Sequence, residues 1–338
     1  MNILILGSGG REHAIAWAVK QNPKCDRLIV APGNAGIATL AETPALDILD
    51  GDAVAQFAVE NAVDLTIVGP EAPLAAGVAD VLRVARLSVV GPSAAAARLE
   101  ASKGFMKAIC DAAGAPTAAY ARFHNPGEAR AHLRAKGAPI VIKADGLAAG
   151  KGVTVAETLP EAEAALESLF GGDLGAAGTE VVIEEVLRGE EASFFCLVDG
   201  ETVLPIGTAQ DHKRSLEGDR GPNTGGMGAY SPAPVLTDAV AERALAEIVR
   251  PTMAVLARQG TPYHGILYAG LMIEDGAPRL VEYNVRLGDP EAQVLMMRLG
   301  AQALDLFQAC AEGRLSEATP HWAGDHALTV VMAAEGYP

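Results

Sequence analysis

A stretch near the C-terminal end decides how the chain is interpreted: Val281-Glu282-Tyr283-Asn284-Val285-Arg286-Leu287-Gly288-Asp289-Pro290-Glu291. Its first half alternates as a β-strand does, so Val281, Tyr283 and Val285 are expected to face the core and Glu282, Asn284 and Arg286 to face the other way. A carboxylate and an amide oxygen on a rigid strand suit a hard divalent cation such as Mg²⁺, and the following arginine can hold a phosphate. The alternative is a half-buried strand with a solvated polar face. Motifs elsewhere in the chain have to distinguish this alternative from a metal and phosphate site.

The composition is that of a folded protein with several domains. The chain has 338 residues, of which 50% are hydrophobic and 20% are charged, and this length predicts two or three domains. The formal net charge of −16 repels nucleic acids and anionic membranes, so an anionic substrate needs local basic or dipolar sites. We therefore expect neither a nucleic-acid partner nor a membrane partner.

The cysteines, the histidines and the N-terminal residues narrow the class further. The four cysteines show no C-x-x-C spacing, and we expect free thiols. Among the histidines only His321 and His326 lie close together, and no cysteine accompanies them, so zinc is not expected. Met1 runs directly into an apolar strand without a charged leader, and no apolar run reaches membrane-spanning length. These features predict a cytoplasmic protein.

The first residues predict a βα unit with an anion site at a helix N-terminus. Ile3-Leu4-Ile5-Leu6 is typical of a buried parallel strand, Gly7-Ser8-Gly9-Gly10 of a tight turn, and Arg11 to Lys20 of a helix. A dinucleotide site would need a third glycine where Glu12 stands. The next strand also ends in Ala31-Pro32-Gly33, without the acidic residue that binds a ribose hydroxyl. A dinucleotide site is therefore disfavoured.

Further βα units follow, and their strands end in glycine–proline turns. Leu65-Thr66-Ile67-Val68 precedes Gly69-Pro70-Glu71, and Ser88-Val89-Val90 precedes Gly91-Pro92-Ser93. Any one of these turns is explained by tight turning alone. Several of them at the carboxyl edge of one parallel sheet favour a crevice for a small molecule.

The middle of the chain carries a glycine loop between two strands. Pro139-Ile140-Val141-Ile142-Lys143 and Val153-Thr154-Val155 flank Ala144-Asp145-Gly146-Leu147-Ala148-Ala149-Gly150-Lys151-Gly152. A Walker loop has four residues between its first glycine and its Gly-Lys pair, and it opens a helix. This loop has three residues between Gly146 and Gly150-Lys151, and it continues as a strand. The arrangement fits a lid over phosphates, with Lys143 reaching a nucleotide and the glycines letting backbone N–H groups approach. A plain glycine-rich hairpin is the alternative.

An acidic stretch follows the glycine loop. Glu180-Val181-Val182-Ile183-Glu184-Glu185-Val186-Leu187 runs from an apolar strand into paired acids, with Gly189-Glu190-Glu191 after it. Such a strand end can present backbone groups to a purine edge, with a carboxylate left for ribose hydroxyls. A solvated acidic turn is the alternative.

Taken together, these features occur in the order of an ATP-grasp ligase, and three runs resemble the glycinamide ribonucleotide synthetase family within that class. The runs are Gly7-Ser8-Gly9-Gly10-Arg11-Glu12-His13-Ala14, Lys143 to Val153, and Gly221-Pro222-Asn223-Thr224-Gly225-Gly226-Met227-Gly228-Ala229-Tyr230-Ser231-Pro232. Leu287 departs from the phenylalanine that the family usually has there. The last residues, Gly336-Tyr337-Pro338, resemble the opening of the family's final small domain.

The resemblance implies an α/β multidomain fold, in which an N-terminal Rossmann-like parallel sheet precedes the ATP-grasp domains and only the start of a C-terminal small domain is present. The implied bounds are 1–101 for the Rossmann-like substrate domain, 102–120 for a linker and helical segment, 121–190 for the lid with its glycine loop, 191–325 for the central ATP-grasp subdomain, and 326–338 for the start of the last domain. It also implies a monomer.

The implied reaction is the ATP-dependent ligation of glycine to 5-phosphoribosylamine in purine biosynthesis, with Mg²⁺ or Mn²⁺ as cofactor. ATP would phosphorylate the glycine carboxylate, and the amine would then displace phosphate. A closing lid would protect the acyl phosphate from water, and charge neutralisation would carry the phosphoryl transfer.

Each site residue takes its implied role from its position in the family's motifs. Arg286 and Lys143 would act on the transferred phosphoryl group. The groups that would bind ATP are Lys103, Lys143, Gly146, Gly150, Lys151, Gly152, Glu184, Glu185, Leu187 and Glu191. The metal ligands would be Glu282 and Asn284. The phosphoribosyl group would be held by Gly9, Gly10, Arg11, Glu12, Pro32, Gly33 and Asn34. The glycine and amine pocket would include Asp211, Lys213, Arg214, Asn223, Thr224, Gly225, Gly226, Met227, Asp289 and Glu291.

Three other functions remain open at this point. Another ATP-grasp ligase could act on a different carboxylate and amine, although the run from Gly221 to Pro232 argues against it. A dinucleotide-dependent oxidoreductase is weakened by Glu12 and Ala31. A nucleotide-binding module without catalysis is the third.

Overall fold

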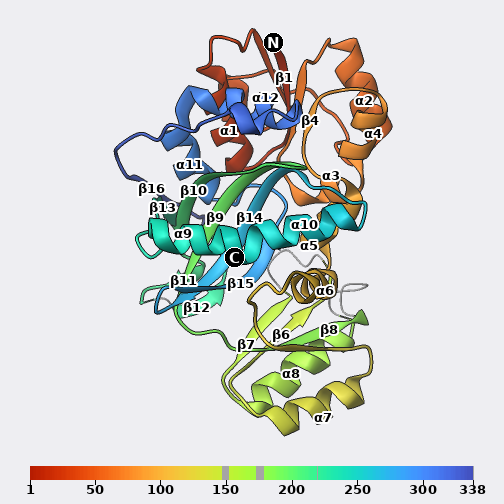
Figure 1. Ribbon diagram of the computed structural model, residues 1–338, viewed down its shortest axis with the longest axis vertical. Coiled ribbons are helices and arrows are strands. Elements are labelled where there is room, and N and C mark those ends of the chain that lie inside the picture. The colour runs from red at the N-terminus through yellow and green to blue at the C-terminus, as the bar shows by residue number, and fades with distance from the viewer. Residues whose placement is uncertain (147–151, 173–178, 219, 338) are drawn as a thin grey trace.

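The computed structural model describes residues 1–146, 152–172, 179–218 and 220–337. Three main sheets follow one another along the long axis of the molecule (Figure 1). The sheet of the N-terminal part lies at the top of the view, a long central sheet lies below it, and the sheet that carries the glycine loop lies at the bottom. This is the α/β multidomain architecture expected from the sequence.

The N-terminal part is a parallel sheet in the order β2-β1-β3-β4. Its strands are β1 Asn2–Gly7, β2 Arg27–Pro32, β3 Leu65–Val68 and β4 Val89–Val90. Its helices are α1 Gly10–Lys20, α2 Gly51–Glu60, α3 Glu71–Ala75, α4 Val78–Val84 and α5 Ala94–Ala101, with a 3₁₀ turn at Ile37–Thr39. The strands are mainly apolar, with Asn2, Arg27 and Thr66 as the polar exceptions, as expected for a parallel sheet whose two faces are both covered. The predicted strands at residues 3–6, 28–30 and 65–68 lie in this sheet, and of the strand predicted at 88–90 the last two residues form β4.

The lid is a small antiparallel sheet with two helices packed together beside it. Its strands are β5 Tyr120–Phe123, β6 Ile140–Ala144, β7 Val153–Ala156 and β8 Val181–Glu185, in the order β5-β8-β6-β7. Its helices are α7 Pro126–Lys136 and α8 Leu159–Phe170. Thr158 caps α8 by a reciprocal bond with Glu161. The lid has an apolar core of its own, separate from the two clusters that the N-terminal and central parts share, so it packs as a distinct unit.

The central sheet is antiparallel in the order β15-β14-β9-β10-β13-β16. Its strands are β9 Glu190–Asp199, β10 Val203–Asp211, β13 Gly228–Ser231, β14 His264–Glu274, β15 Ala277–Asn284 and β16 Ala327–Val330. A separate hairpin pairs β11 Arg214–Leu216 with β12 Arg220–Asn223. The helices are α6 Lys103–Ala113, α9 Asp238–Ala244, a π-helical turn Leu245–Val249, α10 Arg250–Arg258, α11 Glu291–Leu299 and α12 Ala303–Ala311, with 3₁₀ turns at Gly300–Gln302 and Leu315–Glu317.

The strand β15 differs in detail from the alternation expected from the sequence. It ends at Asn284, and Gly270 of β14 pairs with Glu282 whereas Leu271 pairs with Leu280. Val281 is therefore an extra residue, a β-bulge, and it lines the functional cavity instead of the core where it was predicted. Tyr283 and Val285 are buried in the core as expected. The bulge thus directs Glu282 and Asn284 into the cavity while the core contacts continue on either side.

Two further features concern the C-terminal region and membrane association. The strand β16, expected to begin a further domain, pairs with β13 at the edge of the central sheet. In the described part of the chain, every helix is too short or too polar to span a bilayer.

Candidate active site

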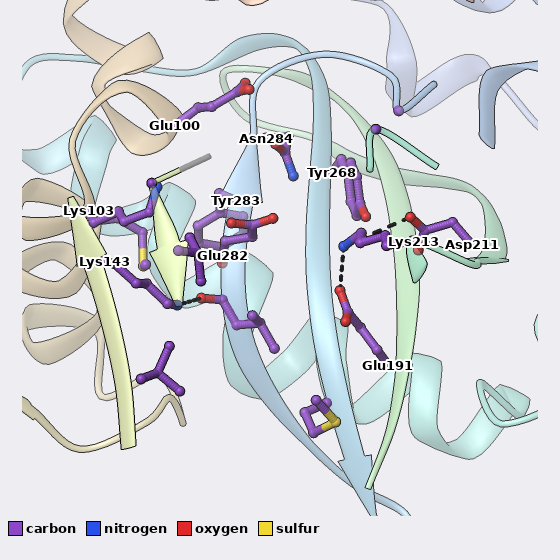
Figure 2. Close-up of a pocket in the computed structure, with 18 of the residues that line it drawn as sticks. Glu100, Lys103, Lys143, Glu191, Asp211, Lys213, Tyr268, Glu282, Tyr283 and Asn284 are labelled. Atoms are coloured by element: carbon purple, nitrogen blue, oxygen red, sulfur yellow. Dashed lines mark hydrogen bonds and ion pairs between the residues drawn. The ribbon is translucent and has the colours of Figure 1, made fainter. Parts of the chain in front are cut away.

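A cavity of about 480 Å³ lies where the lid, the central sheet and the N-terminal part meet. Its walls come from α5 and α6, from lid strands β6, β7 and β8, and from β9, β10, β14 and β15. Figure 2 shows Lys103, Lys143 and Glu282 on one side of this space and Lys213, Glu191 and Asp211 on the other. The charged residues therefore converge from strands that are far apart in the sequence.

Lys103 and the start of the glycine loop are fixed to one another at the N-terminus of α6. Ser102 caps this helix by accepting a hydrogen bond from Phe105 N–H. Asp145 accepts a bond of 2.6 Å from Gly104 N–H and one of 3.0 Å from the Ser102 hydroxyl. Helix N-termini attract anions, and Asp145 uses that preference to attach the lid loop. Lys103 is left facing the cavity.

Glu184 lies buried between two lysines. Its Oε2 is 2.9 Å from Lys143 Nζ, and its Oε1 is 3.4 Å from Lys107 Nζ. The neighbouring Glu185 points elsewhere, to Ala119 N–H at 3.0 Å and to the Arg279 guanidinium. These two bonds hold the pKa of Glu185 below its ordinary value.

Apolar side chains form a slot beside the lysines. The slot takes residues from lid strands and from the central sheet, and its members are Val141, Val153, Val155, Val186, Leu187, Met272 and Val281. Apolar side chains beside a strand end suit a purine ring, which needs apolar faces and backbone groups at its rim.

Glu282 and Asn284 reach into the cavity from the same strand, as Figure 2 shows. Burial pushes the pKa of Glu282 upward, but the charges of Lys213, Lys103, Lys143 and Arg286 outweigh burial and hold that pKa below its ordinary value. The carboxylate is therefore ionised at neutral pH. A carboxylate and an amide oxygen are hard ligands that suit Mg²⁺, which takes few protein ligands and completes its shell with phosphate oxygens and water.

The described residues offer no cluster of three or more His, Cys, Asp or Glu that could enclose a metal by itself. The donor set therefore fits a cation shared with a bound nucleotide, and it does not fit a closed structural site.

Lys213 lies between two carboxylates at the far end of the cavity. Its Nζ is 2.6 Å from Glu191 Oε1 and 3.9 Å from Asp211 Oδ2. Burial raises the pKa of Asp211 to about 7, with Lys213 opposing the shift and Glu291 and Glu191 adding to it. Burial acts to lower the pKa of Lys213, but the nearby Tyr268, Glu191, Asp211 and Glu282 outweigh burial and hold that pKa well above its ordinary value. The lysine is a permanent cation with a weakly held second partner.

Arg286 is fixed by carboxylates from the N-terminal part. Its guanidinium lies 2.9 Å from Glu100 Oε1 and 3.4 Å from Glu71 Oε2. Glu100 also accepts a bond of 2.7 Å from Val285 N–H, and burial raises the pKa of Glu100 despite Arg286. The arginine thus keeps its charge and a fixed position in the lining of the cavity.

Glu291 is buried at the start of α11 and belongs to a chain of hydroxyls. Ser193 Oγ lies 3.2 Å from Glu291 Oε1 and 2.8 Å from Tyr268 OH. The tyrosine can donate to the serine, and the serine to the carboxylate. This network sets the orientation of one cavity-lining acid.

Glu12, in the first turn of α1, packs against the glycine turns of the N-terminal part. Glu12, only 1% exposed, accepts a bond of 2.6 Å from Gly9 N–H and pairs with Arg11 Nε at 2.6 Å. A Cβ on Gly7 would lie 2.5 Å from the Glu12 side chain and one on Gly69 would lie 2.1 Å from it. The glutamate therefore fills the space over the glycine turns, which explains why it replaces the third glycine of a dinucleotide site.

Comparison with known proteins places this geometry in a family. The family model for the N domain of phosphoribosylglycinamide synthetase matches residues 1–100, and the model for its ATP-grasp (A) domain matches residues 101–292. The chain belongs to the phosphoribosylglycinamide synthetase family. The family and its ligase activity, both implied by the sequence motifs, are confirmed.

Individual relatives support the same family. A phosphoribosylamine–glycine ligase of Mesorhizobium japonicum is 60% identical over the whole chain, which spans 80% of that protein. One from Escherichia coli is 53% identical, again across 80% of its length. The crystal structure of a phosphoribosylamine–glycine ligase from Thermotoga maritima is similar over the whole chain and 82% of its own length, with a TM-score of 0.86 and 33% identity. A biotin carboxylase from Campylobacter jejuni, at TM-score 0.73 and 18% identity, shares the fold.

Most of the residues predicted for this synthetase site line the one cavity. They are Arg11, Lys103, Lys143, Gly146, Gly152, Glu184, Glu185, Leu187, Glu191, Asp211, Lys213, Thr224, Gly225, Glu282, Asn284, Arg286, Asp289 and Glu291. Gly150 and Lys151 lie outside the described residues, as does the side chain of Asn223, whose backbone pairs with Arg214. Their roles stay predictions.

The remaining predicted residues of the synthetase surround the cavity without lining it in the described structure. Gly9, Gly10 and Glu12 form the turn described above. Pro32 is the last residue of β2, and Gly33 and Asn34 form the turn after it, where Asn34 Nδ2 donates to Ser8 O at 2.8 Å. Arg214 donates to Gly221 O at 2.8 Å within the hairpin, and Gly226 and Met227 follow it toward β13.

Several cavity or supporting residues were not predicted from the sequence. The sequence predicts only a turn at Glu71, which is the first residue of α3, and Lys107 lies one helical turn after Lys103. Glu100, Ser193 and Tyr268 carry no local motif. Only the tertiary contacts show their relation to the synthetase site.

Proposed function

We propose that this chain joins glycine to 5-phosphoribosylamine with ATP, through a glycyl phosphate, and that the cavity residues have the roles given below. Family membership supports the ligase activity in purine biosynthesis. The observation that carries the assignment of roles is the gathering of Lys103, Lys143, Lys213 and Arg286 around the ionised Glu282 in one cavity. Phosphoryl transfer depends on such neutralisation of charge more than on covalent help from the protein.

The nucleotide is proposed to lie between the lid and the central sheet. The apolar slot would receive the adenine, with backbone groups of 184–187 at its edge. Glu191 would accept from the ribose hydroxyls, after exchanging its present bond with Lys213. Lys103 and Lys143 would contact the phosphates, and their placement at the helix N-terminus and on β6 supports this.

Glu282 and Asn284 would hold the Mg²⁺ or Mn²⁺, which when bound supplies charge neutralisation between the phosphates. Arg286 is held rigid by Glu71 and Glu100. It therefore presents a fixed cation to the phosphoryl group as it leaves ATP for the glycine carboxylate. Lys213 would attract that carboxylate.

In the second step the amine nitrogen attacks the carbonyl carbon of glycyl phosphate, and the phosphate leaves with the bonding electron pair. The amine has to lose a proton as the amide forms. We assign that proton to Glu291, whose carboxylate is oriented by Ser193 and faces the cavity. The phosphoribosyl group would lie against Arg11 and the turn before α1, which the end of β15 and Asp289 adjoin.

Exclusion of water is the proposed task of the lid. Its separate core supports movement as one body, and an acyl phosphate survives only where water is excluded. The domain bounds, the monomeric state and the cytoplasmic location remain predictions from the sequence.

The route through glycyl phosphate is tested with glycine labelled by ¹⁸O in its carboxylate. Attack of a carboxylate oxygen on the γ-phosphorus transfers that oxygen to the released phosphate. We expect one labelled oxygen in the phosphate for each glycinamide ribonucleotide formed. Unlabelled phosphate alongside product would contradict the route.

A further inference from the structure

Lys107 is a fully buried lysine outside the predicted site. It is 0% exposed and lies on α6, one helical turn after Lys103. Its ammonium donates to Thr117 Oγ1 at 2.9 Å and to Ala118 O at 3.1 Å, and it lies 3.4 Å from Glu184 Oε1. Two of the three donors of the ammonium therefore make hydrogen bonds to protein atoms, and the ammonium also forms an ion pair with Glu184.

The position of Lys107 is at the base of the lid. Thr117 and Ala118 precede β5, where the chain enters the lid, and Glu184 lies near the end of β8, where it leaves. Thr117 Oγ1 also donates to Leu280 O at 2.7 Å, which ties the same point to β15. The ammonium therefore contacts both ends of the lid, at Thr117–Ala118 and at Glu184. Through Thr117 it is also linked to β15 of the central sheet.

Charge counting gives this contact a consequence for the nucleotide site. Glu184 is one buried carboxylate with two ammonium groups, Lys107 and Lys143, one at each oxygen. Lys143 faces the cavity, whereas Lys107 is not among the described residues that line it. A buried carboxylate without a cation is strongly unfavourable. If Lys143 were its only partner, moving toward a phosphate would leave Glu184 uncompensated.

We propose that Lys107 is a positioning residue for ATP binding, which neutralises Glu184 and so allows Lys143 to transfer its contact to the triphosphate. This inference rests on the proposed function, because it takes Lys143 as a phosphate-binding group. The contact of Lys107 with Glu184 is at ion-pair distance, and Oε1 accepts no hydrogen bond among the described residues. The two charges therefore attract each other at short range, and removing one of them would leave the other without this partner.

The test measures binding by calorimetry, with Mg²⁺, of three probes: a non-hydrolysable ATP analogue, inorganic tripolyphosphate and adenosine. Lys107→Met is expected to weaken binding of the analogue and of tripolyphosphate about tenfold or more, as losses of buried charge partners do. Its affinity for adenosine should be unchanged. A general loss of structure would weaken adenosine as well. Lys107→Arg keeps the charge and should bind the first two probes far better than Lys107→Met. Lys136→Met removes an exposed lysine from the last turn of α7 and is the matched control, with no change expected.

A double variant separates this role from an independent one. With Glu184→Gln in place, no buried carboxylate competes for Lys143, so adding Lys107→Met should cost less than about threefold in tripolyphosphate affinity. An equal cost with and without Glu184→Gln, or wild-type affinity in Lys107→Met, would overturn the proposal. If Lys107→Met does not fold, Glu184→Gln alone decides, because freeing Lys143 should tighten tripolyphosphate binding, and unchanged or weaker binding would contradict it.

Binding of these probes is measured without turnover. A wild-type chain that turns over normally while Lys107→Met binds normally would overturn this inference and leave the proposed function intact. A wild-type chain without turnover would contradict the proposed function, and the tripolyphosphate comparison would still decide the role of Lys107.

Discussion

The backbone N–H of Arg11 donates a hydrogen bond of 3.1 Å to Oδ2 of Asp289, 278 residues further along the chain. Asp289 Oδ1 also accepts a bond of 2.6 Å from Gln293 Nε2, which holds the carboxylate in place. The first glycine turn of the chain is therefore attached to the loop between β15 and α11. A substrate held at this turn lies directly beside the groups that are proposed to act on ATP and glycine.

Asp289→Ala is expected to raise KM for phosphoribosylamine about fivefold to tenfold, the order of one lost hydrogen bond at a binding turn. KM for ATP should change less than twofold, because the nucleotide contacts lie on other strands. Initial rates with each substrate varied in turn give both values. Asp305→Ala is the matched control, since Asp305 also accepts a bond from the N-terminal part, from Asn22 at 3.0 Å, but lies outside the cavity. Equal effects of Asp289→Ala on both KM values would contradict the assignment.

Gly69→Ala should destabilise the chain by about 1–3 kcal/mol. The new Cβ would lie 2.1 Å from Glu12 Oε1, and Glu12 cannot retreat easily because Gly9 and Arg11 both hold it. The free energy of unfolding from denaturant titration measures the loss. Gly324→Ala meets no atom within 4 Å and serves as the control. If the two variants unfold alike, Glu12 does not fill the glycine turns as described.

Local sequence patterns predicted most of the fold because they depend on neighbouring residues. The apolar run Ile3-Leu4-Ile5-Leu6 and the glycine turn after it gave β1 and the start of α1, and the glycine loop was placed between β6 and β7. The bulge at Val281 was missed because it depends on the register of β15 against Gly270 and Leu271 of β14. The alternation of residues within one strand does not determine how that strand pairs with its neighbour.

The candidate site divides in the same way. Glu282, Asn284 and the lysines could be named because they belong to short motifs. The ion pairs of Arg286 with Glu71 and Glu100 could not be found, since they join segments about two hundred residues apart. The same holds for Ser193, which contacts both Tyr268 of the neighbouring strand and Glu291 of α11 only in the folded chain.

Asp211 should make the stability of the chain depend on pH. Burial raises the pKa of Asp211 to about 7, against an ordinary value of 3.8. Between these values the folded chain holds a proton that the unfolded chain releases, so stability falls as pH rises toward 7. Asp211→Asn lacks this proton. The wild type should lose up to about 2 kcal/mol relative to Asp211→Asn between pH 5 and pH 7, measured by denaturant unfolding at each pH. A constant difference between the two chains would show that Asp211 ionises normally.

Glu282→Ala should abolish glycine-dependent ADP formation while the chain remains folded, because the variant loses the carboxylate proposed to hold the metal. Thermal unfolding and the rate at saturating Mg²⁺ are measured together. Glu274→Ala, exposed at the end of β14 in the same hairpin, is the matched control and should keep full activity. An unchanged rate for Glu282→Ala at saturating Mg²⁺ would exclude the metal assignment.

ADP formation by the wild-type chain with Mg²⁺ATP, when glycine and phosphoribosylamine are each supplied and each omitted, tests the proposed two-step ligation most directly. We expect sustained ADP release only when both are present, in a one-to-one ratio with glycinamide ribonucleotide, because the closed lid would hold the acyl phosphate until the amine arrives. Sustained ADP release at the same rate without glycine, or full release with glycine replaced by another amino acid, would contradict it.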